Sequence, residues 1–112
     1  MKKLEVVIRQ EKVPQMKAIL SETGVTGAMF TSVSGYGNQK SQQYVFRGET
    51  HYEQIFLKTK VETVVSDEVA DVLIQRILKD IPTGEVGDGK IFVYDIADIY
   101  RIRTGEQGPN AL

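Results

Sequence analysis

Hydrophobic and polar residues alternate between residues 3 and 9, and this pattern predicts a half-buried β-strand. The apolar side chains of Leu4, Val6 and Ile8 fall on one face, whereas the opposite face is largely charged. A helix is expected next, because Pro14 suits a first helical turn and an apolar stripe follows it.

This helix is expected to end at Gly24, and residues 28–33 form a second predicted strand. From residue 35 to residue 57 the sequence is polar, charged and aromatic without a regular period. Loops of this length in compact domains are usually functional or disordered. We therefore predict a long mobile arm over residues 35–57.

Alternation returns over residues 58–65, which predicts a third strand. Ser66 then suits a helix N-cap, acidic residues occupy the first turn, and a broad apolar face continues toward Pro82. After this helix, residues 90–94 predict a fourth strand and residues 99–103 a short fifth strand.

The order strand–helix–strand thus occurs twice, once on each side of the arm. This order predicts an α+β fold, a ferredoxin-like βαβ-βαβ sandwich with both helices on one face of the sheet. A chain of 112 residues suits a single domain, 1–112. Such a small open sheet leaves edges and one face exposed, which a homo-oligomer would cover.

The composition of the chain argues against several classes of function. Fourteen basic residues against fifteen acidic ones give a formal charge of -1, so direct nucleic-acid binding is not expected. No cysteine and a single histidine leave no disulfide, thiolate chemistry or His/Cys metal cluster. No apolar run approaches the ~20 residues that span a bilayer, and the N-terminal residues alternate instead of forming a signal sequence. We expect a cytoplasmic protein.

Residues 83–90 read Thr-Gly-Glu-Val-Gly-Asp-Gly-Lys, a pattern typical of an anion-binding loop. Its glycines allow the main chain to approach a ligand closely, and Lys90 adds a positive charge. Gly84, Gly89 and Lys90 also have the spacing of a P-loop. However, Ile91 stands where a P-loop needs a hydroxyl, and this loop runs from a helix into a strand. A P-loop nucleotide hydrolase is therefore not expected.

Arg101 and Arg103 lie two positions apart on the predicted fifth strand. Their guanidinium groups are thus expected on one face, about 6.6 Å apart at ~3.3 Å per residue. Two such groups can clasp a polyphosphate, although alternating Arg and Ile is also typical of any half-exposed strand.

The stretch from Thr83 to Val93 matches the signature of the P-II nitrogen-regulatory signal proteins at every defined position. Further matches lie at Gly35-Tyr36-Gly37, Gln39-Lys40, Phe46-Arg47-Gly48, Lys58 and Arg101-Ile102-Arg103-Thr104-Gly105-Glu106. The chain resembles this family over essentially its whole length. The resemblance implies a non-enzymatic signalling protein, a homotrimer with ligand sites in the clefts between subunits. Residues 82–90 would be its nucleotide-phosphate loop and residues 104–112 its C-terminal tail.

The resemblance also implies competitive binding of ATP or ADP. The glycine loop and Lys90 would hold the phosphates, Glu62 and Val64 would lie near the ribose and adenine, and the two arginines would reach across the subunit boundary. The implied nucleotide-binding residues are Gly35, Gly37, Asn38, Gln39, Glu62, Val64, Gly87, Asp88, Gly89, Lys90, Arg101 and Arg103.

A second implied effector is 2-oxoglutarate, bound by Gln39, Lys40 and Lys58, with Gln39 also helping to hold a Mg²⁺ ion that bridges it to the ATP phosphates. Gln39 and Lys58 bracket the arm, so a ligand held by both would couple binding to the arm's shape. Taken alone, Lys58 also fits a solvated strand-edge lysine. The arm would dock onto an ammonium transporter or a nitrogen-assimilation enzyme or regulator, with Arg47 inserting into the partner. Membrane contact would come only through such a transporter.

The chain departs from the family pattern at several positions. Asn38 replaces a phosphate-binding arginine, and His51 stands where relatives carry a modifiable tyrosine, which excludes nucleotidylation there. Tyr52, one residue later, is a weak candidate to replace that tyrosine as the modified residue. Leu57 replaces the proline that usually precedes the lysine at position 58. Two alternatives follow: a divergent adenine-nucleotide sensor without a 2-oxoglutarate response, acting on a different partner, or slow nucleotide hydrolysis. Hydrolysis lacks a positioned base beside the loop, apart from Asp88.

Overall fold

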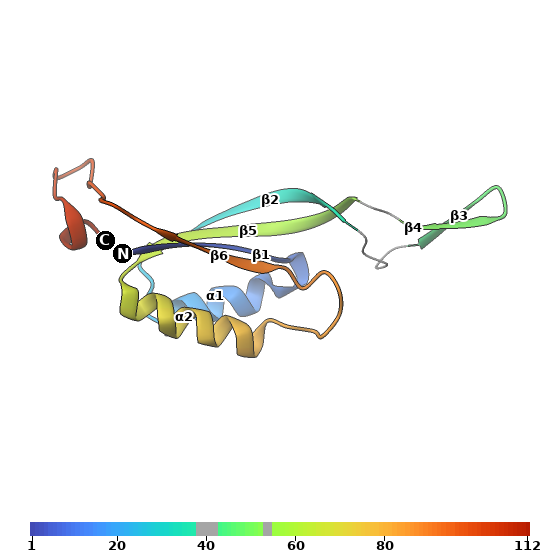
Figure 1. The fold of residues 1–112 in the computed structure, drawn as a ribbon, viewed down its shortest axis with the longest axis horizontal. Coiled ribbons are helices and arrows are strands. Elements are labelled where there is room, and N and C mark those ends of the chain that lie inside the picture. The colour runs from blue at the N-terminus through green and yellow to red at the C-terminus, as the bar shows by residue number, and fades with distance from the viewer. Residues whose placement is uncertain (38–42, 53–54) are drawn as a thin grey trace.

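The computed structural model describes residues 1–37, 43–52 and 55–112. Its main layer is a four-stranded antiparallel sheet in the order β2-β5-β1-β6. These strands are β1 (Lys2–Arg9), β2 (Met29–Tyr36), β5 (Ile55–Val65) and β6 (Lys90–Asp95). Helices α1 (Val13–Glu22) and α2 (Asp67–Asp80) both lie against one face of this sheet (Figure 1). The predicted ferredoxin-like α+β sandwich is confirmed.

The hydrophobic core lies between the helices and the sheet. Its fully buried side chains come from β1, α1, α2 and β5, and the largest are Leu4, Val6, Ile8, Met16, Ile19, Val61 and Leu73. The other face of the sheet, called the open face below, is not covered by either helix (Figure 1). By strand register it carries Lys3, Glu5, Val7 and Arg9 of β1 and Lys58, Lys60, Glu62 and Val64 of β5. The alternation in the sequence therefore assigned both strands to the correct faces.

The helix boundaries follow the predicted signals. Pro14 lies in the first turn of α1, after the short 3₁₀ helix η1 (Gln10–Lys12), and Gly24 follows its end at φ +79°. Ser66 caps α2, because its hydroxyl oxygen accepts a hydrogen bond of 3.2 Å from the N–H of Val69. Within the described residues, no helix is long and apolar enough to cross a membrane.

The expectation of irregular chain throughout residues 35–57 is wrong in the described part. Strand β2 continues through Gly35 and Tyr36, which pair with Phe56 and Ile55 at the start of β5. Main-chain pairing joins these strand ends, which project beyond the helices, and the side chain of Phe56 is buried. Residues 55–57 are all apolar, so no alternating period marks this strand end in the sequence.

The arm itself contains a β-hairpin formed by β3 (Gln43–Phe46) and β4 (Glu49–Tyr52). Arg47 and Gly48 form its turn, both at positive φ (54° and 80°), as a two-residue hairpin turn requires. In the described part of the chain, this hairpin forms a separate sheet from the main one. The predicted mobility of the arm stays a prediction.

The predicted strand over residues 99–103 is wrong. The chain turns back instead, because the N–H of Gly105 binds the carbonyl of Arg101 (2.7 Å) and the N–H of Arg101 binds the carbonyl of Glu106 (2.8 Å). Gly105 has φ +74°, which permits this reversal. What remains of β-structure is a single bridge between Tyr100 and Gln107, followed by the 3₁₀ helix η2 (Gly108–Ala111). The prediction that Arg101 and Arg103 lie on one face of a strand is therefore also wrong.

Candidate functional site

A glycine loop connects the end of α2 to the start of β6, as the sequence predicted. Gly84, Gly87 and Gly89 all adopt positive φ, at +89°, +102° and +98°. Residues other than glycine rarely adopt positive φ, so the path of the main chain through this loop depends on the three glycines. The N–H groups of Thr83 and Gly84 and the carbonyls of Val86 and Gly87 in this loop have side-chain partners.

Asp88 organises this loop. One carboxylate oxygen accepts hydrogen bonds from the N–H groups of Thr83 and Gly84, both at 2.9 Å. The other accepts from the Thr83 hydroxyl (2.5 Å) and from Nε of Arg9 (3.1 Å). The Thr83 hydroxyl, with Arg9 and the two N–H groups, holds the pKa of Asp88 well below its usual range. Asp88 is therefore an ionised structural anchor of the turn.

Two cationic side chains, one from β1 and one from β5, donate hydrogen bonds to carbonyl groups of the loop. Arg9, at the end of β1, donates from Nη2 to the carbonyl of Val86 (2.8 Å). Its strand neighbour Lys58 donates from Nζ to the carbonyl of Gly87. Lys58 is buried, and this burial, with the nearby charge of Arg9, lowers its pKa. Lys58 is thus a buried cation that ties the base of the arm to the glycine loop, unlike a solvated strand-edge lysine.

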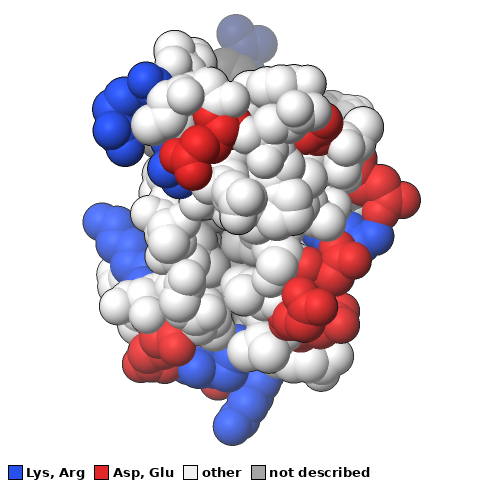
Figure 2. Space-filling model, turned by 90° about the vertical axis from the view of Figure 1, so that its left-hand side faces the viewer, with Lys and Arg blue, Asp and Glu red and all other residues white. Residues whose placement is uncertain are grey.

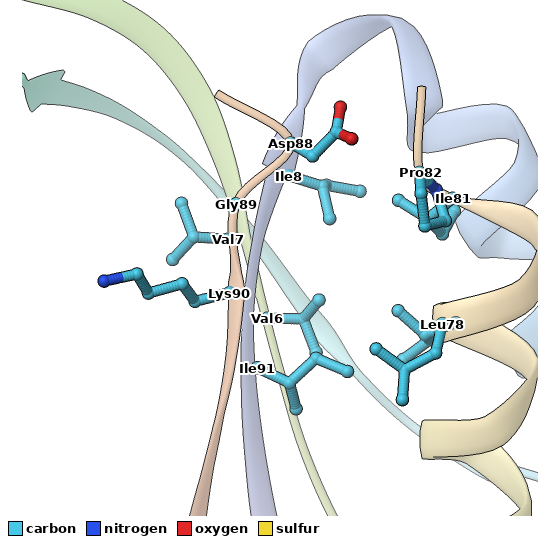
Figure 3. Close-up of a pocket in the computed structure, with 11 residues that line it drawn as sticks. Val6, Val7, Ile8, Leu78, Ile81, Pro82, Asp88, Gly89, Lys90 and Ile91 are labelled. Atoms are coloured by element: carbon cyan, nitrogen blue, oxygen red, sulfur yellow. The ribbon is translucent and has the colours of Figure 1, made fainter. Parts of the chain in front are cut away.

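Lys90 begins β6 on the open face. It pairs with Val7, which in turn pairs with Lys60, so two lysines flank one valine across three strands. Figure 3 shows Lys90 and Val7 pointing away from the cavity between the sheet and the end of α2. That cavity is about 90 Å³ and mainly apolar, with Leu78 among its lining residues. Typical ligand pockets are about 300–1,000 Å³, so this cavity is too small for a nucleotide.

Glu62 and Val64 lie on the open face of β5, toward its far end from the arm. The Glu62 carboxylate is 3.3 Å from the ammonium of Lys3 and 3.8 Å from that of Lys60. Gly35, which pairs with Phe56, and Gly37 lie at the end of β2. Asn38, Gln39 and Lys40 lie outside the described residues.

Arg101 and Arg103 follow β6 in the sequence, and the segment after β6 lies at the end of the molecule where both termini are found (Figure 1). The structure therefore does not bring them to the glycine loop of the same chain. Arg101 instead forms an ion pair with Glu106 (3.0 Å) and donates to the main-chain oxygen of Leu112 (3.0 Å). Figure 2 views this end of the molecule, where basic and acidic side chains are interspersed around broad uncharged surface.

A family model described as "Nitrogen regulatory protein P-II" matches residues 1–106. The chain belongs to the P-II family. The P-II nitrogen regulatory proteins of Pasteurella multocida and Klebsiella oxytoca are 42% and 39% identical to it, over the full length of both chains in each comparison. P-II proteins are signalling regulators and not enzymes, so the expected absence of enzymatic activity is confirmed by family membership.

Solved P-II structures have the same fold. A structure of GlnK from B. subtilis matches with a TM-score of 0.81 at 38% identity, covering 99% of this chain and 97% of that one. A structure of the B. subtilis GlnK–ATP complex matches with a TM-score of 0.79 at 36% identity, covering 99% and 96%.

Arg9 is the site residue that the sequence did not reveal. Its partners, Val86 and Asp88, lie 77 and 79 positions away in the sequence. In the sequence Arg9 is only the last polar residue of an alternating strand, so no local pattern indicates the contact.

Proposed function

We propose that this P-II protein binds ATP or ADP competitively at its glycine loop and reports nucleotide state to a nitrogen-metabolism partner. The observation that carries the proposal is the preordered loop from Thr83 to Lys90, with its three positive-φ glycines and an exposed lysine at its end. The B. subtilis GlnK–ATP complex, which shares 36% of its sequence with this chain, supports the choice of ligand.

The nucleotide site requires a second copy of the chain. Lys90 begins β6, whereas Arg101 and Arg103 belong to the segment that continues beyond the other end of this strand, so a single copy cannot place both around one triphosphate. The open face supports assembly, because it displays Met29, Phe92 and Tyr94, each more than 40% exposed. A homotrimer would cover this face and bring the arginines of one copy to the loop of the next.

We further propose 2-oxoglutarate as the second effector, acting alongside Mg·ATP. The buried ammonium of Lys58 lies beside the glycine loop, where it could pair with a carboxylate next to the bound phosphates. Gln39 and Lys40 would complete this site. Among the described residues no three His, Cys, Asp or Glu side chains gather as a metal site, so Mg²⁺ would be held by the nucleotide phosphates and Gln39.

The arm carries the output. Arg47 lies exposed at the tip of the β3–β4 hairpin, where it would insert into a partner such as an ammonium transporter or a nitrogen-assimilation enzyme or regulator. Each effector can shift the arm only by as much as it prefers one arm conformation over another. The link from Lys58 at the arm's base to Gly87 in the loop is a contact through which such a preference could act.

A second candidate is an adenine-nucleotide sensor that does not respond to 2-oxoglutarate. Asn38 favours it, because the chain lacks the positive charge that an arginine would provide at this position. Calorimetric titration of ATP, of ADP, and of 2-oxoglutarate with and without saturating Mg·ATP separates the two. Binding of 2-oxoglutarate that requires Mg·ATP supports the first proposal, nucleotide binding alone supports the second, and no nucleotide binding contradicts both.

A further inference from the structure

The guanidinium of Arg9 contacts two points of the glycine loop at once. It donates from Nε to Asp88 at 3.1 Å and from Nη2 to the carbonyl of Val86 at 2.8 Å. The side chain is only 16% exposed, so water competes weakly for these contacts. Because the guanidinium is planar with donors at fixed angles, it fixes the two acceptors relative to each other.

The orientation of these carbonyls determines where the next N–H groups point. In a trans peptide the C=O of one residue and the N–H of the next point in opposite directions, and the described part of the chain contains no cis peptide. Because the Val86 carbonyl points toward Arg9, the N–H of Gly87 points away from Arg9. Because the Gly87 carbonyl points toward Lys58, the N–H of Asp88 points away from Lys58.

These two N–H groups differ from those at the start of the loop. The N–H groups of Thr83 and Gly84 are already bound by the Asp88 carboxylate. In contrast, the N–H groups of Gly87 and Asp88 have no hydrogen-bond partner within residues 1–37, 43–52 and 55–112. Two adjacent main-chain donors of this kind form an anion-binding concavity.

We propose that Arg9 is a positioning residue that turns the N–H of Gly87 toward the phosphates of a bound nucleotide, beside the N–H of Asp88, which the contact of Lys58 with Gly87 orients. The proposal rests on the nucleotide-binding function proposed above and assigns the orientation of the phosphate-binding groups to a residue that does not itself touch the ligand. Loss of Arg9 should therefore weaken phosphate recognition and leave recognition of the nucleoside unchanged.

Three variants test this role. Arg9→Gln removes the charge and the forked donors, whereas Arg9→Lys keeps the charge and can contact only one acceptor well. Arg76→Gln is the matched control, because the guanidinium of Arg76 on helix α2 also contacts two acceptors, the carboxylates of Glu22 and Asp80. Thermal unfolding and the assembled mass of each variant establish that it folds and assembles as the wild type does.

Calorimetry with ATP, inorganic tripolyphosphate and adenosine provides the ligand readout. We expect Arg9→Gln to bind ATP and tripolyphosphate about 10-fold more weakly, to bind adenosine as the wild type does, and Arg9→Lys to recover part of the loss. Arg76→Gln should match the wild type for all three ligands. An equal loss for ATP and adenosine, or unchanged ATP affinity in Arg9→Gln, would overturn the proposal.

Amide hydrogen exchange without ligand tests the loop directly. In Arg9→Gln the N–H groups of Thr83 and Gly84 should exchange faster, because Asp88 has lost the contact that fixes it. Unchanged exchange would overturn the role of Arg9 whether or not nucleotide binds. Failure of the wild type to bind either ATP or tripolyphosphate would instead overturn the nucleotide function and, with it, the phosphate part of this proposal.

Discussion

Gly89 lies directly against the main chain of Val7, at the point where β6 begins to pair with β1. A Cβ atom built at Gly89 would come within 1.7 Å of the Val7 carbonyl oxygen, and the residue has φ +98°. Both features require glycine. This close approach fixes where the glycine loop joins the sheet, and thereby the position of Lys90.

We therefore expect Gly89→Ala to lower the free energy of unfolding by more than about 3 kcal/mol, because the new methyl group displaces backbone. Gly84→Ala is the matched control in the same loop. Gly84 also has positive φ, at +89°, but its added Cβ would meet nothing within 4 Å. It should cost only about 1 kcal/mol. Urea unfolding measures the free energy of unfolding of each variant. An equal decrease in the two variants would show that the close contact of Gly89 with Val7 does not matter for stability.

The depressed pKa of Asp88 makes part of the stability dependent on pH. A carboxyl group whose pKa is lowered by folding stabilises the protein above its unfolded pKa of about 3.9 and loses that contribution as the pH falls below it. Asp88→Asn should thus be about 2 kcal/mol less stable than wild type at pH 7. This difference should shrink as the pH drops from 5 to 3, as measured by urea unfolding. A difference independent of pH would rule out the charge as its cause.

The N-cap of α2 gives a local test of the fold. Ser66→Ala removes the acceptor of the Val69 N–H and should lower the free energy of unfolding by about 1 kcal/mol. Ser21→Ala, at an exposed position in α1, is the control and should change stability by less than about 0.5 kcal/mol. Equal effects of the two substitutions in thermal unfolding would show that the cap contributes nothing specific.

The arm should be separable from the folded body. Its hairpin forms a sheet of its own in the described chain, so replacing Gln42–Gln54 with a short Gly/Ser linker should change the free energy of unfolding by less than about 0.5 kcal/mol. ATP binding should remain while partner binding is lost, as a pull-down against a candidate transporter would measure. Unfolding of the shortened protein would show that the arm belongs to the core.

The sequence predicted those parts of the fold whose signals are local. The alternation of Leu4, Val6 and Ile8 and the Ser66 cap identify β1 and α2 because burial and capping act over a few neighbouring residues. The strand ends around Gly35 and Phe56 were missed because cross-strand main-chain hydrogen bonds define them.

The C-terminal segment shows how an alternating pattern can mislead. Residues 99–103 alternate like a strand, but the hydrogen bonds of Arg101 close a turn onto Gly105 and Glu106 instead. The glycine of Thr104-Gly105 is the local signal that indicates this turn. At the site, the sequence identified the glycine loop and Lys90. The contact of Arg9 with Asp88 is set by the tertiary fold and has no local signal.

The central claim is that one copy supplies Lys90 and the next copy supplies Arg103. Lys90→Ala and Arg103→Ala homotrimers should each assemble but fail to bind ATP. Unfolding and reassembling an equal mixture of the two should restore binding in about a quarter of the clefts, those where intact Lys90 faces intact Arg103. Calorimetric titration of the mixture with ATP measures this fraction directly. Recovered sites would support a composite cleft, and a mixture as inactive as its components, beside a wild type that binds ATP, would contradict it.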